Sequence, residues 1–404
     1  EPRRVACRAL ARYVAELEGA RLGDRVGYAV RDERRAGPGT RLVFATLGVV
    51  LRWLARGGGL DADAVVLDEL HERGLEVDLL LALLAERFAG ALVAMSATLD
   101  GDRVARHLGG VHLAASGRTF PVVERHVPGE ALLPDTRGLE ERLGEALGRS
   151  RDDAGDVLVF LPGKGEIARA ARALEGGGHG EILPLHGGLT LEQQSRVFAP
   201  RDRRRVILAT NVAETSITVP GVGVVVDAGL VRRTRYVDGR AVLTLVPVAL
   251  DSAAQRAGRA GRTAPGVCYR LWSREARLEP TTPPEVHREA LAPLVLAAAA
   301  CGARVERLPF LDPPRDYAVA DAERELRALG ALDRAGAITA RGRRLFGLPL
   351  DAALGAVLVE AERSGCLDDA LDLAAALAVP RPLFAGPRPR DPERDLRQIG
   401  RAHV

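Results

Sequence analysis

The sequence has 404 residues, and at about 100–200 residues per domain this length predicts two to four domains. Its 57 Lys and Arg residues nearly balance 54 Asp and Glu residues, so the net charge of +3 excludes a large electric field of one sign. No charge-free run reaches the roughly 18 residues of a transmembrane helix. Four cysteines lie far apart without a C-x-x-C pair, which argues against structural zinc and disulfide frameworks and favours a reducing, cytoplasmic location.

Lysine is almost absent from the chain. Arginine supplies 56 of the 57 Lys and Arg residues, and the one lysine, Lys164, is followed by Gly165. A Walker-type phosphate loop requires Gly-Lys-Ser or Gly-Lys-Thr. The 404 residues therefore contain no such loop, and we expect Lys164 to be a solvated loop residue.

Strands and helices alternate over the first two thirds of the chain. Short apolar runs that end at polar or small residues are typical of parallel strands buried on both faces. These runs cover residues 42–46, 64–68, 92–96, 157–161, 206–210 and 222–227. Helices are predicted between them at 78–88 and 191–198. The alternation predicts an α/β fold, and the polar stretch 116–137 divides it into two α/β domains.

The last third of the chain is helix-rich. Before it, a β-hairpin is predicted around Asp238-Gly239, because this dipeptide is typical of two-residue turns. A helix at 323–329, a short segment at 337–339 and a helix at 341–346 are similar to a winged-helix module. The Ala- and Leu-rich residues 352–377 suit the start of a helical bundle.

Two adjacent carboxylates follow the apolar run 64–67. Asp68 and Glu69 are therefore expected at the carboxyl end of a buried strand, where α/β sheets bind ligands. One carboxylate can hold a hydrated Mg²⁺ ion while the other polarises a water for attack on a γ-phosphate. A solvated Asp-Glu pair at a strand end is the alternative. The next apolar run ends in Ser96-Ala97-Thr98, whose hydroxyls could bond to this site.

Polar residues also follow strands of the second domain. Hydroxyl and amide side chains in 209–216 suit the phosphate oxygens of a nucleic-acid strand, although they are also typical of a turn. Arg256, Arg259 and Arg262 recur at a spacing of three, which we interpret as guanidinium groups on one edge that can grip a γ-phosphate across a cleft. With 56 Arg in the chain, a solvated Arg-rich helix is the alternative.

Read in order, these segments resemble the motifs of DEAH-type helicases of superfamily two, and among them the bacterial HrpB-type ATP-dependent helicases. Residues 1–6 resemble motif Ia, 46–52 motif Ib, 68–73 motif II, 96–98 motif III, 157–162 motif IV, 209–227 motif V and 255–262 motif VI. The resemblance implies two RecA-like parallel-sheet domains, followed by a winged helix and the start of a helical bundle. The corresponding ranges are 1–120, 121–283, 284–348 and 349–398.

The resemblance also implies an enzyme that couples ATP hydrolysis to 3′-to-5′ stepping along single-stranded RNA or DNA, with ATP and Mg²⁺ as cofactors. Asp68 and Glu69 would serve Mg²⁺, and Glu69 would orient or activate the attacking water. The other implied catalytic residues are His71, which would couple the site to the second domain, and Gln255, Arg259 and Arg262, which would face the γ-phosphate. Ser96 and Thr98 would couple the two domains. Thr218 would lie near the ribose, and Arg12 or Tyr13 would cover the base. The residues implied to hold the nucleic-acid backbone are Arg3, Arg4, Thr46, Arg52, Thr210 and Asn211.

Both ends of the sequence depart from the family pattern. Family members carry Gly-Lys-Ser/Thr before motif Ia, so we expect the chain to be an internal fragment that does not hydrolyse ATP alone. Residues 399–404 resemble a translated sequencing adapter and are expected to be an artefact. An alternative function is a non-catalytic nucleic-acid-binding relic without a P-loop. Intact Asp68, Glu69, Arg259 and Arg262 favour the enzyme, because a relic does not need them.

Overall fold

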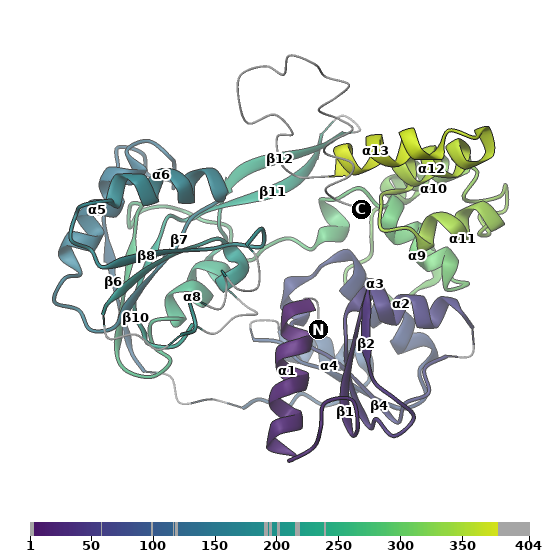
Figure 1. The fold of residues 1–404 in the computed structure, drawn as a ribbon, viewed down its shortest axis with the longest axis horizontal. Helices are drawn as coiled ribbons and strands as arrows, with labels where there is room; N and C mark the ends of the chain where they lie inside the picture. The colour runs from purple at the N-terminus through teal and green to yellow at the C-terminus, as the bar shows by residue number, and fades with distance from the viewer. Residues whose placement is uncertain are drawn as a thin grey trace.

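Three modules make up the protein in the computed structural model (Figure 1). The structure describes residues 4–378, apart from residues 58, 98–99, 116, 118–119, 190–192, 194–195, 200–202, 215–218 and 238–239. The N-terminal module lies at the lower right of Figure 1, the central module at the left and the C-terminal module at the upper right. The α/β fold class is confirmed. None of the helices described is long and apolar enough to cross a membrane.

The N-terminal module carries two separate small sheets. Its helices are α1 (Arg4–Leu17), α2 (Leu47–Ala55), α3 (Leu75–Arg87) and α4 (Gly101–Leu108). Its strands are β1 (Val26–Val30), β2 (Glu33–Arg35), β3 (Leu42–Ala45), β4 (Ala64–Leu67) and β5 (Ala91–Ala94). The three-stranded sheet has the order β2-β1-β3, and β4 pairs with β5 in parallel.

The predicted burial of these strands on both faces is wrong. Val66 in β4 and Val93 in β5 are 50% and 44% exposed. The described sheet is divided into two pieces, and β1 is the only one of its described strands that is buried along its whole length. Helix α3 supplies the apolar core instead, because its residues 77–84 are all buried and it packs against α2 and against α9 (Ala292–Ala300) of the C-terminal module.

The central module is built on one parallel sheet of six strands in the order β6-β13-β10-β7-β9-β8. Its strands are β6 (Val122–His126), β7 (Asp156–Phe160), β8 (Glu181–Leu185), β9 (Arg205–Ala209), β10 (Val222–Asp227) and β13 (Gly266–Arg270). Its helices are α5 (Leu139–Arg149), α6 (Lys164–Leu174) and α8 (Leu250–Gly258). Every residue of β7 and β9 is buried, which confirms the prediction of burial on both faces for this module. The helix predicted at 191–198 lies largely outside the described residues.

The predicted β-hairpin is confirmed. Strands β11 (Leu230–Val237) and β12 (Arg240–Pro247) pair in antiparallel register from Leu230 opposite Pro247 to Val237 opposite Arg240. The hairpin projects from the central module at the top of Figure 1. The turn residues Asp238 and Gly239 lie outside the described residues.

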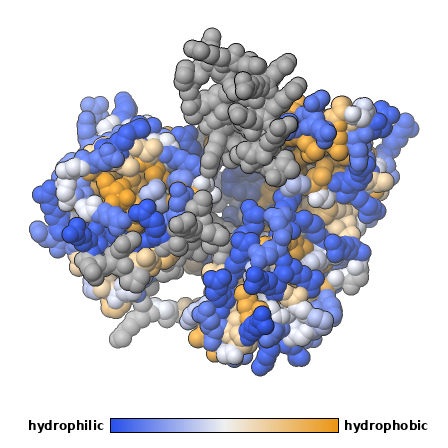
Figure 2. Space-filling model, viewed as in Figure 1, coloured by the Kyte–Doolittle hydropathy of each residue, from blue (hydrophilic) through white to orange (hydrophobic). Residues whose placement is uncertain are grey.

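The C-terminal module is helical. Its elements are η3 (Glu285–His287), α9, η4 (Val305–Arg307), α10 (Asp316–Ala328), α11 (Ala340–Gly347), α12 (Ala352–Ser364) and α13 (Leu367–Ala378). Between α10 and α11 a bridge joins Leu332 to Ile338, which gives the helix–strand–helix order of the predicted winged helix. The region 352–377 forms two helices because Gly365, with φ 74°, ends α12 in the left-handed conformation. Apolar surface is visible in Figure 2 where Figure 1 places α12 and α13.

Candidate nucleotide and nucleic-acid site

Asp68 and Glu69 lie at the carboxyl end of β4, where the backbone turns sharply. Glu69 has φ 57° and Arg73 has φ 47°, and the short helix η1 (Leu70–Glu72) lies between them. These two are the only non-glycine residues with positive φ in the described part of the chain. The left-handed conformation costs a residue with a Cβ about 1–2 kcal/mol. Such strain gathers at functional sites, which makes this turn the first candidate.

His71 lies beside the Glu69 carboxylate in the same turn, although its buried Nε2 makes no hydrogen bond there. Its side chain is 8% exposed, and its Nε2 lies 3.2 Å from Oε2 of Glu69. The backbone N–H of Ala97 donates to Nδ1 of His71 at 3.4 Å, so the ring proton sits on Nε2 and faces Glu69. Both contacts lie within the N-terminal module. His71 therefore links the motif II turn to the Ser96-Ala97 segment after β5.

The environment of Glu69 favours its protonated form. Burial raises the pKa of Glu69, and the charges of Asp68 and Glu72 raise it further, while His71 and Arg259 oppose this rise. The amide of Glu69 also donates to Oδ1 of Asp68 at 2.8 Å, which keeps the two carboxylates side by side. A carboxylate with a raised pKa is a stronger base than a solvated one, as is required of a group that takes a proton from water.

Arg259 and Arg262 of the central module face Glu69 of the N-terminal module. The charge of Arg259 acts on Glu69, and the charge of Glu69 acts on Arg262, whose pKa burial lowers. Arg259 follows the last residue of α8 and donates from Nη2 to the backbone oxygen of Glu214. Three of the predicted catalytic residues, of which Glu69 is almost 200 positions from the other two in the sequence, thus lie within electrostatic range of one another across the boundary between two modules.

Arg256 does not share an edge with the other two arginines, so that expectation is wrong. It is 1% exposed, and it donates from Nε to Oε2 of Glu214 and from Nη1 to Oδ1 of Asp227, both at 2.8 Å. Burial alone would lower the pKa of Arg256, but the charges of Asp227 and Glu214 raise it. Its guanidinium lies 5.0 Å from the centre of the Phe160 ring. Helix α8 ends at Gly258, so the spacing of three does not continue as one helical face.

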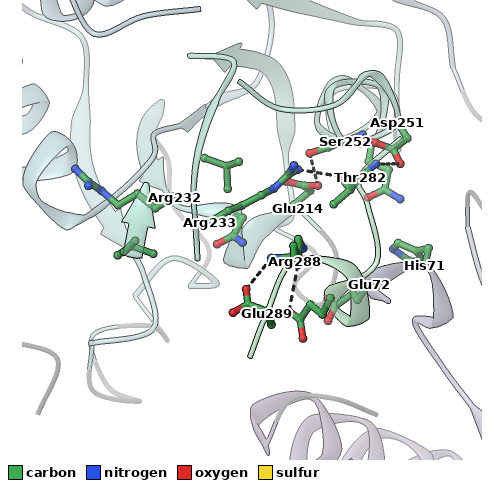
Figure 3. Close-up of a pocket in the computed structure, with 15 residues that line it drawn as sticks. His71, Glu72, Glu214, Arg232, Arg233, Asp251, Ser252, Thr282, Arg288 and Glu289 are labelled. Atoms are coloured by element: carbon green, nitrogen blue, oxygen red, sulfur yellow. Dashed lines mark hydrogen bonds and ion pairs between the residues drawn. The ribbon is translucent and has the colours of Figure 1, made fainter. Parts of the chain in front are cut away.

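A cavity of about 300 Å³ lies where all three modules meet (Figure 3). His71 and Glu72 line it from the N-terminal module, Asn211 and Gln255 from the central module, and Arg288 from the C-terminal module. Three of the predicted site residues, His71, Asn211 and Gln255, therefore line the same cavity. The cavity lies beside the turn formed by residues 68–73, because His71 and Glu72 of that turn line it. Its other walls come from the central and C-terminal modules.

The cavity is lined by charges of both signs. Ser252 donates to Oε1 of Glu214 at 2.6 Å, and Nη2 of Arg233 donates to Oγ1 of Thr282 at 2.9 Å. Burial lowers the pKa of Arg233, and the nearby charge of Arg288 lowers it further. Arg233 and Arg288 carry no local sequence signal in this Arg-rich chain, and so sequence reasoning did not find them.

The predicted nucleic-acid residues fall into two cavities. Arg4, Thr46 and Arg52 line a cavity of about 860 Å³ between the N-terminal and C-terminal modules, and Arg31 lines it with them. Burial lowers the pKa of Arg31, and the charge of Arg52 lowers it further, while Asp32 and Glu76, which also line the cavity, oppose this shift. Thr210 and Asn211 instead line a cavity of about 370 Å³ in the central module, together with its residue Lys164.

The other predicted site residues lie elsewhere. Arg12 and Tyr13 are on the exposed side of α1. They line neither the cavity of about 300 Å³ nor the cavity of about 860 Å³. Ser96 follows β5 and is exposed. Arg3, Thr98 and Thr218 lie outside the described residues.

The carboxylates present fit a magnesium ion that is shared with a nucleotide. In the part of the chain that the structure describes, no group of three or more His, Cys, Asp or Glu side chains could hold a metal ion. Mg²⁺ is commonly bound by one or two carboxylates together with substrate phosphates. Asp68 and Glu69, held side by side, match that donor set.

Two family models match parts of the chain. Residues 139–264 match the family "Helicase conserved C-terminal domain". Residues 351–402 match the family "Helicase associated domain (HA2), ratchet-like", a match that extends into the residues 399–404 expected to be an artefact. The two matches lie in the central module and at the end of the chain.

Similar proteins extend the match to almost the whole chain. The ATP-dependent RNA helicase HrpA of Escherichia coli is 36% identical over 402 residues, which cover 95% of this chain and 31% of HrpA. The ATP-dependent RNA helicase HrpB of the same organism is 37% identical over 398 residues, which cover 94% of this chain and 48% of HrpB. A crystal structure of the E. coli DEAH/RHA helicase HrpB matches with a TM-score of 0.84 and 35% identity, over all of this chain and 53% of that one. The chain thus spans 31% of the length of HrpA and 48% of the length of HrpB, and over almost all of its own length it is similar to these two helicases.

Proposed function

We propose that this protein is an ATP-dependent helicase that steps 3′-to-5′ along a single strand of RNA or DNA. One observation carries the proposal: Arg259 and Arg262 of the central module lie within electrostatic reach of Glu69 of the N-terminal module. A nucleotide bound between them would be contacted from both modules. The similarity to HrpA and HrpB, which are named ATP-dependent RNA helicases, supports RNA as a substrate.

Hydrolysis would use the groups that meet at this boundary. Glu69, with its raised pKa, would orient the attacking water and accept its proton, and His71 lies 3.2 Å from its carboxylate. Arg259 and Arg262 would stabilise the negative charge that develops on the transferred phosphoryl group. Mg²⁺, held by Asp68 and the nucleotide phosphates, would neutralise phosphate charge.

Movement would follow from where the two nucleic-acid surfaces lie. Arg4, Thr46 and Arg52 belong to one module, and Thr210 and Asn211 belong to another. ATP would draw the two modules together through Arg259 and Arg262, and loss of the γ-phosphate would release them. The spacing of the two surfaces along the strand would then change with each cycle, which is a step.

The role of Glu69 is tested by Glu69→Gln in the product of the complete gene. Hydrolysis should fall by at least about 100-fold, because the amide cannot accept the proton of water. Binding of single-stranded RNA should stay within about twofold, since Glu69 does not line the nucleic-acid cavities. Glu86→Gln, at an exposed site on α3, is the control and should retain full activity. Normal turnover in Glu69→Gln would contradict the assignment.

Polarity and substrate are tested by unwinding. Duplexes with a single-stranded tail at either the 3′ or the 5′ end, made of RNA or DNA, are mixed with the protein and ATP. We expect strand separation only from the 3′ tail. Unwinding from the 5′ tail alone would contradict the proposed direction, and the RNA and DNA tails compare the two substrates.

A nucleic-acid-binding relic is the alternative, and it rests on the absence of Gly-Lys-Ser/Thr from the 404 residues. We expect the purified 404-residue chain to bind single-stranded RNA and to hydrolyse no ATP above background. A measurable ATPase signal from that chain would contradict this expectation. The DNA upstream of the Glu1 codon separates the alternatives, because an open frame that encodes Gly-Lys-Ser/Thr there favours the enzyme.

A further inference from the structure

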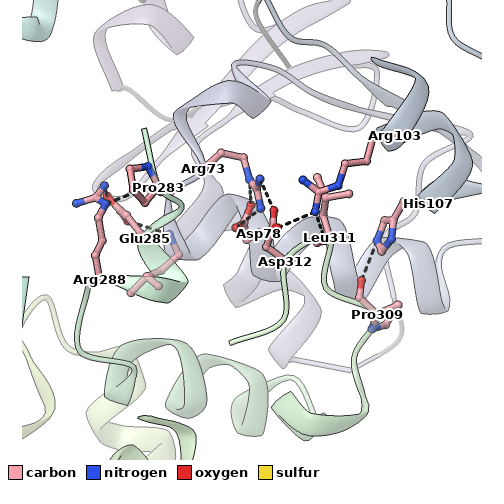
Figure 4. Close-up of polar contacts among 11 residues, drawn as sticks. Arg73, Asp78, Arg103, His107, Pro283, Glu285, Arg288, Pro309, Leu311 and Asp312 are labelled. Carbon is pink, nitrogen blue, oxygen red and sulfur yellow. Dashed lines mark hydrogen bonds and ion pairs between the residues drawn. The ribbon is translucent and has the colours of Figure 1, made fainter. Parts of the chain in front are cut away.

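A buried ionic network joins the catalytic turn to the C-terminal module (Figure 4). Arg73 ends the turn that begins at Glu69, and it is 5% exposed. Its Nε and Nη2 donate to the two carboxylate oxygens of Asp78 in α3 at 2.9 and 3.0 Å. Its Nη1 forms an ion pair with Oδ2 of Asp312 at 2.7 Å. One guanidinium is therefore shared between its own module and the C-terminal module.

Arg103 of α4 and Glu285 of η3 extend this junction. Nη2 of Arg103 donates to Oδ1 of Asp312 at 2.6 Å and to the backbone oxygen of Leu311 at 2.9 Å. The amide of Glu285 donates to the backbone oxygen of Arg73 at 2.9 Å, and Oε2 of Glu285 accepts from the amide of Leu75 at 2.9 Å. The backbone and the side chain at position 73 are thus both held by residues of the C-terminal module.

The conformation of Arg73 makes these contacts consequential. A non-glycine residue stays in the left-handed region only where the contacts around it hold it in that conformation. At Arg73 those surroundings are Asp78, Asp312 and Glu285. If Asp312 and Glu285 withdrew, Arg73 could return to a right-handed conformation, and the turn that orients Glu69 would change with it.

The C-terminal module is placed to sense the strand. Leu345, Phe346 and Asp351 line the large cavity opposite Arg52, so a strand held there contacts the C-terminal module as well as α2. Helix α9 packs on α2 and α3, which joins this cavity to the network at Arg73. A shift of the C-terminal module on the strand would therefore be passed to Asp312 and Glu285.

We propose that Arg73 and Asp312 are positioning residues through which nucleic acid bound against the C-terminal module sets the orientation of the Glu69 turn and thereby the rate of ATP hydrolysis. The proposal rests on the proposed function. In this proposal the ionic network at Arg73 couples strand binding to ATP hydrolysis, and it also stabilises the fold.

The structural part of the proposal is tested without ATP, by hydrogen exchange on the 404-residue chain. Asp312→Asn should speed exchange of the Leu70, Glu72 and Arg73 amides, which close the turn, by roughly tenfold, since the turn opens more often. Asp321→Asn is the matched control, because Asp321 lies in an exposed ion pair with Arg324, and it should leave these amides unchanged. Unchanged exchange in Asp312→Asn would overturn the proposal.

A second variant covers the case in which Asp312→Asn does not fold. Arg103→Gln removes the partly exposed partner that holds Oδ1 of Asp312, so the carboxylate that pairs with Arg73 is less firmly placed. Faster exchange of the same three amides, by roughly threefold or more, supports the proposal, and unchanged exchange overturns it.

The coupling itself is tested with the product of the complete gene, by ATP hydrolysis with and without single-stranded RNA. Asp312→Asn should lower the ratio of stimulated to basal rate by at least about fivefold, and Asp321→Asn should keep the ratio. A purely structural role would reduce the amount of active protein in both assays alike and leave the ratio unchanged, which would overturn the proposal. A wild-type protein without any hydrolysis would contradict the proposed function instead, while the exchange result would still stand.

Discussion

Arg256 is the most enclosed cation of the central module. Its partners are also buried, because the side chains of Asp227 and Glu214 are 1% and 13% exposed. Charges removed from water are tolerated only where they compensate one another and their hydrogen bonds are made. Arg256 compensates the charge of both carboxylates and donates to one oxygen of each, and it fixes α8 against β10. Because Arg259 directly follows α8, the contacts of Arg256 also fix the position where the segment with Arg259 begins.

Replacement of Arg256 should therefore destabilise the module. Arg256→Met keeps the volume of the side chain and removes its charge, which leaves Asp227 and Glu214 uncompensated. We expect a loss of about 3–5 kcal/mol in the free energy of unfolding, measured by urea denaturation of the 404-residue chain. Arg363→Met, which removes an exposed partner of Glu360, should leave the free energy of unfolding nearly unchanged. Equal losses in the two variants would contradict the role of Arg256.

At this scale the sequence predicted residues whose signal is local. The position of Asp68 and Glu69 follows from the apolar run before them, and the structure places both at the end of β4. The burial of Arg256 and the contacts of Arg73 were not predictable in the same way. Their partners Asp227 and Asp312 come from distant segments, and no spacing rule connects them with the arginines.

Secondary-structure elements differ in how clearly the sequence marks them. The inner strands β7, β9 and β10 are continuous apolar runs, because helices cover both faces of the sheet, and all three were predicted. Strands β6, β8 and β13 were missed, although β13 lies inside the sheet. Strands β6 and β8 lie at the two edges of the sheet, where they are only partly buried and where Glu124 and Glu181 interrupt the apolar pattern. Edge strands tolerate such residues, so their composition does not distinguish them from loops.

Helix ends depend on single residues that pattern reasoning passes over. The Ala- and Leu-rich stretch 352–377 has the same composition before and after residue 365, yet Gly365 divides it into α12 and α13. Helix α3 begins at Leu75 instead of residue 78, and Glu285 of the C-terminal module accepts a hydrogen bond from the amide of Leu75. Tertiary contacts from another module thus help to set where that helix starts.

The arrangement of the whole molecule decides how a strand could be held. The cavity that contains Arg4, Thr46 and Arg52 has walls from two modules, and the cavity that contains Thr210 and Asn211 lies in the third. A strand that occupies both spaces would contact every module, including the one that carries Asp312. The same strand would then contact both surfaces whose spacing changes in the proposed cycle. Its affinity should depend on the arginines of the larger cavity, which are Arg4, Arg31 and Arg52.

Arg52→Gln should weaken binding of single-stranded RNA to the 404-residue chain. If Arg52 contacts one phosphate, its removal should lower the slope of log affinity against log salt concentration by about 0.7, because fewer counterions are released. Fluorescence anisotropy with a labelled oligonucleotide, between about 50 and 200 mM salt, measures this slope. Arg56→Gln is the matched control, because Arg56 is exposed at the end of the same helix and does not line the cavity. The same slope in both variants would place the strand outside this cavity and leave the C-terminal module without contact to it.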